Sequence, residues 1–177
     1  MPPRHGKSYT ISSPFPAWYL GNWPDRRVML GSHTAELSTG FGRKAQDLLS
    51  RFGPQFFGVS VRDDSRAADR WEIARHGGEM YSLGIGGPAT GRGADLLILD
   101  DFCKNAEEAL SPTYRQKAWD WYTTTWLTRK QPGASEVIVA TRWHDDDLIG
   151  RLLADLKGER VRVLRLPAIA EDDDELG

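Results

Sequence analysis

Residues 94–101 read ADLLILDD, an apolar run that ends in two adjacent aspartates. A continuous run of leucine and isoleucine, without alternation of polar and apolar positions, predicts a strand buried on both faces. The residues before it, GIGGPATGRG at 84–93, are rich in glycine and predict a loop. The expected strand therefore presents the carboxylates of Asp100 and Asp101 at its carboxyl end.

The segments on either side of this run alternate between strand and helix patterns. Buried strands are predicted at residues 27–33, 136–141 and 161–166, and helices at 35–51, 106–129 and 146–156. Residues 71–74 and 80–85 flank His76-Gly77-Gly78 and predict a β-hairpin, as a small insertion or at an edge of the sheet. This alternation predicts an α/β fold with a mostly parallel sheet flanked by helices.

Length and composition set broad limits on the class of protein. The chain has 177 residues, which suits one domain, and 40% of them are hydrophobic, which is enough for a core. The formal net charge of −2 gives no global indication of a nucleic-acid or membrane partner. We expect no membrane span, because no apolar run reaches about 18 residues. We expect no secretory leader, because prolines and Gly6-Lys7-Ser8 follow Met1 in place of an apolar segment. The single cysteine, Cys103, allows no internal disulfide and suits a reducing compartment.

Gly6-Lys7-Ser8 matches the end of the phosphate-loop pattern G-x-x-x-x-G-K-[ST], with Met1 at the first glycine position. In that pattern Gly6 allows the backbone to approach the phosphates. Lys7 supplies a point charge to the β- and γ-phosphates, and the Ser8 hydroxyl contacts Mg²⁺. A three-residue match is common by chance, so a surface turn is the better interpretation of this tripeptide alone.

The two aspartates change that assessment. A site for Mg·ATP needs a carboxylate at the end of a buried strand beside the loop, and Asp100 is placed to be this metal ligand. Asp101 is then placed to polarise the attacking water, a role that glutamate fills more often. The alternative is that the pair caps a helix or lies in a solvated turn. A phosphate loop upstream makes this alternative the weaker one.

A third candidate element is VIVATRWHDDD at residues 137–147. A strand that ends in small and hydroxyl-bearing residues next to the aspartate strand can sense the γ-phosphate, and Thr141 is the candidate for this role. Arg142 or His144 could relay the change. For His144, a structural pairing with the acids at 145–147 is an equal alternative.

Six segments together resemble the large terminase subunit of tailed bacteriophages and prophages. They read PPRHGKS, PAWYLGNWPDRRVMLGSH, DSRAADRWEI, GGPATGRGADLLILDDFCKN, SPTYRQKAWDWYTTTWLTR and VIVATRWHDDDLIGRLL, and they occur in the family's order. Proteins of this family carry an N-terminal ATPase that drives DNA into a procapsid, followed by a nuclease domain. The resemblance therefore implies a P-loop NTPase fold of the ASCE type, with ATP and Mg²⁺ as cofactors.

The resemblance also assigns roles to individual residues. The Walker A segment spans residues 1–8, so Pro3, Arg4 and His5 join Gly6, Lys7 and Ser8 as nucleotide-binding residues, and Arg4 reaches the γ-phosphate in cis. Asp100 matches the Walker B metal ligand, and Asp101 takes the catalytic position after it.

Two further residues acquire roles from the resemblance. Ala140-Thr141 matches the motif that couples hydrolysis to domain movement. Arg92, in the glycine-rich loop before the aspartate strand, is a candidate arginine finger that acts in trans on a neighbouring subunit.

The implied partners are double-stranded phage DNA, the small terminase subunit, the portal protein and further copies in a ring, in the cytoplasm of the bacterial host. We expect a truncated ATPase domain at residues 1–170 and an acidic tail or linker at 171–177. The family's strand and adenine-binding segment before the phosphate loop have no match here, and no nuclease is expected. The chain therefore resembles a fragment, or a gene whose start was placed at an internal methionine, and its own ATPase activity is uncertain.

Two alternatives to a packaging ATPase stay open at this point. One is a non-catalytic prophage remnant that only contacts other packaging proteins. The other is a different P-loop ATPase that acts on DNA, such as a helicase-like enzyme.

Overall fold

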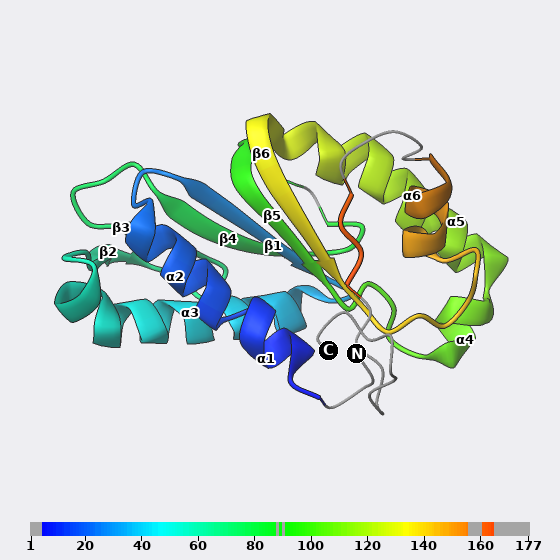
Figure 1. The fold of residues 1–177 in the computed structure, drawn as a ribbon, viewed down its shortest axis with the longest axis horizontal. Coiled ribbons are helices and arrows are strands. Elements are labelled where there is room, and N and C mark those ends of the chain that lie inside the picture. The colour runs from blue at the N-terminus through cyan, green and yellow to red at the C-terminus, as the bar shows by residue number, and fades with distance from the viewer. Residues whose placement is uncertain (1–4, 88, 90, 156–160, 165–177) are drawn as a thin grey trace.

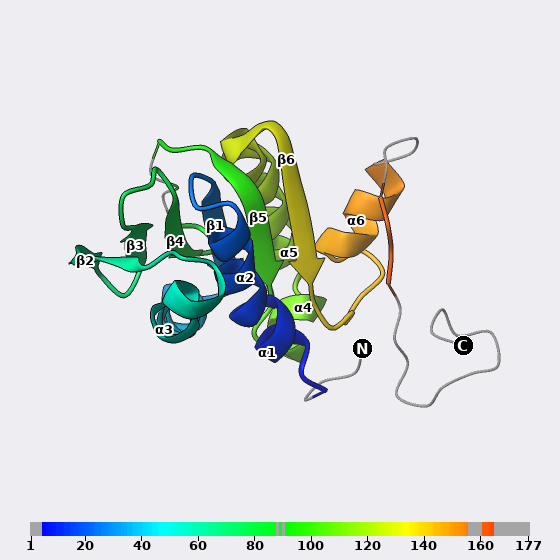
Figure 2. The same cartoon turned by 60° about the vertical axis from the view of Figure 1, so that its left-hand side comes forward.

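The computed structural model describes residues 5–87, 89, 91–155 and 161–164, and over these residues helices cover both faces of a six-stranded sheet (Figures 1 and 2). The strands are β1 (Arg27–Ser32), β2 (Val61–Arg66), β3 (Arg70–Ile73), β4 (Glu79–Gly84), β5 (Ala94–Asp100) and β6 (Lys130–Val139). The helices are α1 (Lys7–Ile11), α2 (Pro14–Asn22), α3 (Ala35–Phe56), α4 (Ala106–Leu110), α5 (Pro112–Trp121) and α6 (Leu148–Asp155). Residues Tyr122–Trp126 continue α5 as a π-helix, and Leu127–Arg129 form a 3-10 turn.

The strands follow the order β2-β3-β4-β1-β5-β6. Strands β4, β1, β5 and β6 run parallel to one another, whereas β3 pairs antiparallel with both of its neighbours, β2 and β4. The predicted α/β class is therefore confirmed, and the sheet is mixed rather than mostly parallel. The parallel strands all end at one edge, which we call the carboxyl edge of the sheet.

The predicted hairpin is present as β3 and β4, which pair antiparallel across His76-Gly77-Gly78. Its second strand is not an insertion, because β4 also pairs in parallel with β1 in the middle of the sheet. Strand β2, VRDDSR, was not predicted from the sequence. Its charged residues show no apolar alternation, and its backbone hydrogen bonds to β3 form the strand.

Helices α2 and α3 cover one face of the sheet. Helix α3 begins after Thr34, whose hydroxyl caps it by accepting a hydrogen bond from the Leu37 amide. The predicted helix is confirmed, and its residues Ala45 and Leu49 are buried against the sheet. The helix ends at Phe56 rather than at the predicted residue 51, because the chain continues through Pro54 without breaking the helix.

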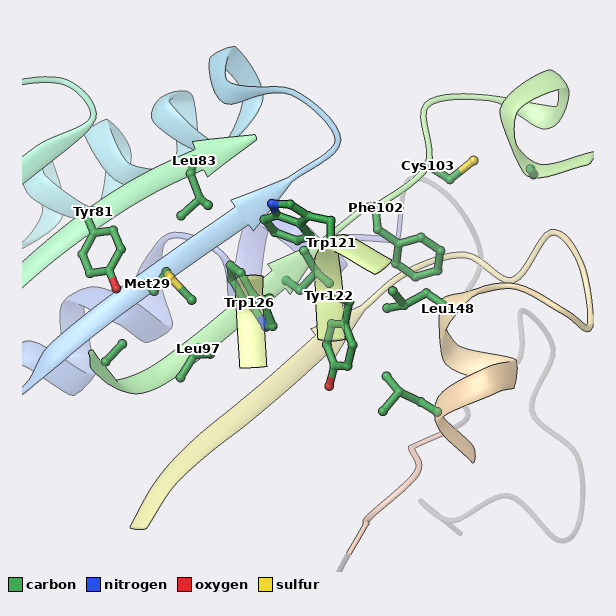
Figure 3. Close-up of a cluster of buried hydrophobic side chains, with 14 residues drawn as sticks. Met29, Tyr81, Leu83, Leu97, Phe102, Cys103, Trp121, Tyr122, Trp126 and Leu148 are labelled. Atoms are coloured by element: carbon green, nitrogen blue, oxygen red, sulfur yellow. The ribbon is translucent and has the colours of Figure 1, made fainter. Parts of the chain in front are cut away.

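Helices α4, α5 and α6 cover the opposite face, where they enclose an aromatic core (Figure 3). Trp121 and Trp126 lie in contact there, with 5.4 Å between their ring centroids. The predicted helical region 106–129 is thus confirmed with a break at Ser111, whose hydroxyl caps the start of α5 at Pro112. The predicted helix at 146–156 is also present, as α6.

Strand β6 differs from the predicted buried strand at 136–141 in its extent and exposure. It begins at Lys130, and its residues are half-buried or exposed, because only β5 pairs with it among the described residues. Of the predicted strand at 161–166, residues 161–164 are exposed and carry no strand assignment, and the other two lie outside the described residues. No helix in the described part of the chain is long and apolar enough to cross a membrane.

Candidate functional site

The turn before α1 places the predicted phosphate-binding residues. Gly6 has a φ of +83°, a left-handed conformation that glycine adopts without steric cost. Helix α1 begins directly after it at Lys7, so Gly6 is the N-cap residue of this helix. The predicted role of Gly6, to let the backbone approach the phosphates, stays a prediction.

Lys7 and Thr141 meet at the carboxyl edge of the sheet. The Lys7 ammonium donates a hydrogen bond of 2.7 Å to the Thr141 hydroxyl, which follows the end of β6. The two residues are 134 positions apart in the chain, and both are half-buried. The structure thus brings together the lysine and the hydroxyl that the sequence predicted to face the same phosphate.

Asp100 ends β5 at the same edge and is only 1% exposed. Its carboxylate accepts hydrogen bonds from the Ser12 hydroxyl and from Ser8. Burial raises the pKa of Asp100, while the two serine hydrogen bonds and the charge of Lys7 oppose the shift. A buried carboxylate next to an ammonium and two hydroxyls is therefore the centre of this candidate site.

The backbone of Asp101 is held in an unusual conformation. Its φ of +53° lies in the left-handed region, which residues with a β-carbon rarely adopt. The Asp101 amide donates to the Val139 carbonyl at 2.9 Å. The Asp101 carbonyl accepts from the His33 amide at 3.1 Å and from His33 Nδ1 at 3.0 Å. The turn after β5 is thus fixed to the ends of both neighbouring strands.

Ser12 and His33 lie at this site but were not predicted from the sequence. The spacing of Ser12 gave a weak indication, because it follows Ser8 by four positions and would share the same helix face. His33 carried no such signal. Its contact depends on β1 and β5 being neighbours, which only the strand order shows.

The oxygen atoms at the carboxyl edge suit the coordination of a magnesium ion. Mg²⁺ typically takes one or two protein oxygens and keeps several waters, and Ser8 with Asp100 supply such oxygens. Ser32, the last residue of β1, adds a completely buried hydroxyl for which the described residues offer no hydrogen-bond partner. By strand register it lies one position beyond the Gly31–Leu99 pair, at the level of Asp100. Over the same described residues, no cluster of three or more His, Cys, Asp or Glu side chains forms a cage for a metal.

Comparison with known protein families matches residues 1–177 to the model described as terminase large subunit, T4likevirus-type, N-terminal. The chain belongs to this terminase family. Membership implies a role in the packaging of phage DNA. A search of curated proteins found no match.

Arg92, the predicted arginine finger of this terminase domain, lies at the sheet edge opposite Asp100. Its guanidinium contacts Glu79, the first residue of β4, at 2.8 and 3.1 Å. Arg27 and Arg70 contact the same carboxylate, at 3.5 and 3.1 Å. The trans role concerns a neighbouring subunit and stays a prediction. Within one chain, Arg92 does not join the Asp100 site.

The residues nearest the chain start can be placed only in part. Pro3 and Arg4 lie outside the described residues, so their predicted contacts with nucleotide stay predictions. His5 is exposed and directly precedes the Gly6 turn. Its contact with nucleotide stays a prediction.

The loop after Thr141 connects the site to α6. Arg142 donates to the Asp147 carboxylate at 2.7 Å and to the carbonyls of His144 and Asp145. Asp147 is buried and accepts from the Gly150 amide in the first turn of α6. His144 Nδ1 accepts a hydrogen bond from the Asp146 backbone amide, so this contact is made to the backbone and not to an acidic side chain. Two residues, Arg142 and His144, were predicted to relay the change. Of these, Arg142 connects the loop after Thr141 to the start of α6 through its ion pair with Asp147.

Proposed function

We propose that this chain is the ATPase motor part of a terminase large subunit. It binds ATP with Mg²⁺ at the carboxyl edge of a P-loop NTPase-type sheet. It couples ATP hydrolysis to the movement of double-stranded DNA into a procapsid. Family membership supports the packaging role, and the geometry at the carboxyl edge supports the ATPase.

One observation carries the ATPase proposal. Lys7, Asp100 and Thr141 come from three distant parts of the chain and lie at one edge of the sheet, joined by hydrogen bonds from Lys7 to Thr141 and from Ser8 and Ser12 to Asp100. If Gly6-Lys7-Ser8 were only a surface turn, the Lys7 side chain would be expected to face solvent. Instead it contacts Thr141, 134 positions away, beyond the end of β6. The arrangement matches what phosphoryl transfer needs, which is mainly positioning and charge stabilisation.

The roles of the side chains follow from their chemistry. Lys7 has three N–H donors and a full positive charge, so it can bind the β- and γ-phosphate oxygens. Ser8 and Asp100 would hold Mg²⁺, which neutralises charge on the phosphates when bound. Asp101, fixed by its backbone contacts to β1 and β6, would take a proton from the attacking water.

Coupling to DNA would run through the end of β6. The Thr141 hydroxyl, next to Lys7, would respond to the γ-phosphate, and the Arg142–Asp147 ion pair would transmit the change to α6. We propose that the working unit is a ring in the host cytoplasm, on double-stranded DNA, with the portal protein and the small terminase subunit. In this ring Arg4 would act in cis and Arg92 in trans.

Nucleotide binding by a lysine variant tests the site. Each charge-assisted contact to a phosphate is worth roughly 1.5–3 kcal/mol, so Lys7→Ala should weaken ATP binding by roughly tenfold or more. Isothermal titration calorimetry with Mg·ATP measures this change. Lys117→Ala removes an exposed lysine from α5 and should bind ATP like the wild type.

Two results would contradict the proposal. Equal ATP affinity in Lys7→Ala and wild-type protein would refute the assignment of the phosphate site. Equal background hydrolysis in the wild type, Lys7→Ala and Asp101→Asn would favour a non-catalytic packaging remnant.

A further inference from the structure

Ser12 is a buried hydroxyl that none of the sequence patterns assigns to the site. It is completely buried at the end of α1, where its hydroxyl donates to Asp100 Oδ2. Its amide also donates to the Ser8 carbonyl at 2.9 Å, which closes the last turn of the helix. The Ser12 side chain is therefore held by its own backbone in a position that faces the Asp100 carboxylate.

Ser8 and Ser12 contact the same carboxylate from one helix face. They are four positions apart, the spacing that brings side chains together on an α-helix, and both hydrogen-bond Asp100. A carboxylate has two oxygens with about four acceptor positions in total. A hydroxyl fixed on Oδ2 sets the rotation of the Asp100 side chain and leaves acceptor positions for another ligand.

We infer that Ser12 is a positioning residue that orients Asp100 toward a bound magnesium ion. This inference rests on the proposed nucleotide site. Groups that hydrogen-bond a metal-ligating side chain fix its orientation, and their loss typically weakens metal binding without removing a ligand. Ser12 would thereby set how strongly Mg²⁺ strengthens nucleotide binding, while the contacts of Lys7 with the phosphates would not depend on it.

The test compares ADP binding with and without Mg²⁺, by isothermal titration calorimetry on the whole chain. In wild-type protein Mg²⁺ should increase ADP affinity. In Ser12→Ala this increase should fall by roughly tenfold, the scale known for residues that support metal ligands, while ADP affinity without Mg²⁺ stays at the wild-type value.

Ser13→Ala is the matched control. Ser13 is the adjacent residue and is also buried, but its hydroxyl points to the Phe41 carbonyl, 3.4 Å away. It should keep the full effect of Mg²⁺. A second variant, Ser12→Cys, retains the size of the side chain with a weaker donor and should lose most of the Mg²⁺ effect. If thermal melting shows that Ser12→Ala does not fold, the comparison with and without Mg²⁺ is made with Ser12→Cys instead.

The outcomes separate the inference from the proposed function. No ADP binding by the wild type, with or without Mg²⁺, would overturn the nucleotide site itself. Normal binding by the wild type, with the same Mg²⁺ effect in the folded Ser12 variants as in Ser13→Ala, would overturn the role of Ser12 alone.

Discussion

Asp101 combines a strained backbone with a predicted catalytic side chain. A left-handed conformation at a residue with a β-carbon costs on the order of 1–3 kcal/mol, and it persists only where the surroundings hold it. Here three hydrogen bonds from His33 and to Val139 hold it. Such strain often occurs at functional sites, and it supports a specific requirement for the direction of the Asp101 carboxylate.

The first prediction is that Asp101→Asn keeps nucleotide binding and loses turnover. Asparagine tolerates the left-handed conformation and has nearly the same shape, but its amide cannot accept a proton from water. We expect hydrolysis to fall by about 100-fold or more, measured as phosphate release at saturating ATP, with an ATP affinity near that of the wild type.

Asp101→Gly provides the control for strain. It should be equally inactive, yet its melting temperature should be no lower than that of Asp101→Asn, because glycine adopts this φ without cost. Full turnover in either variant would show that the side chain takes no part in the reaction.

At the scale of elements, the π-helix Tyr122–Trp126 determines how the sheet and α5 fit together. The Tyr122 hydroxyl and Trp126 Nε1 both donate to the Glu136 carboxylate on β6, at 3.1 and 2.8 Å. The Trp126 ring then lies over β1 at Gly31, where a β-carbon would come within 2.7 Å of the ring. The close approach of helix and sheet therefore requires glycine at this position.

The second prediction is that Gly31→Ala lowers the free energy of unfolding by about 1–3 kcal/mol, because the added methyl overlaps Trp126 in a packed core. Chemical denaturation measures this change. Gly40→Ala is the control. Gly40 lies within α3 with no atom near its would-be β-carbon, so alanine should stabilise the protein by about 0.5–1 kcal/mol. Equal stability of Gly31→Ala and the wild type would contradict the packing argument.

At the scale of the whole molecule, two charged sites lie at opposite edges of the sheet. The carboxyl edge carries Lys7 and Asp100. The amino edge, where the parallel strands begin, carries Glu79 with its arginine partners. A chain arranged in a ring can present its amino edge to the carboxyl edge of a neighbour. Arg92 is 45% exposed at its side chain and is therefore accessible for such a contact.

The third prediction is that Arg92→Ala reduces ATP turnover only in the assembled ring of the complete large subunit. Glu79 would remain neutralised by Arg27 and Arg70, so the fold should survive. Arg70→Ala is the matched control, because it removes another partner of the same carboxylate. In mixed rings, Asp101→Asn subunits, which keep Arg92, should restore turnover at the sites of neighbouring Arg92→Ala subunits, which keep Asp101. Equal losses in Arg92→Ala and Arg70→Ala would indicate a structural effect instead.

The fourth prediction concerns coupling through Thr141. Thr141→Val removes the hydroxyl that accepts from Lys7 but keeps the shape of the side chain. We expect ATP binding within a few-fold of the wild-type value and continued hydrolysis, but no DNA packaging by the complete large subunit. The exposed Thr128 gives a control in Thr128→Val. Normal packaging by Thr141→Val would exclude the coupling role.

The sequence by itself determined the features that depend on neighbouring residues. The apolar run of β5 predicted a buried strand with Asp100 at its end, and the structure confirms it. The helix predicted at residues 35–51 is present as α3, and a turn is present at Gly6, because helix starts and turns depend on residues a few positions apart.

Only the tertiary structure decided which of these local features meet. Ser12 reaches Asp100 across 88 positions, and Lys7 reaches Thr141 across 134, because the parallel strands end at the same edge. The contact of His33 with Asp101 likewise follows from the pairing of β1 with β5. Strand order and register are set by the packing of the whole sheet and its helices, which no single segment of the sequence specifies.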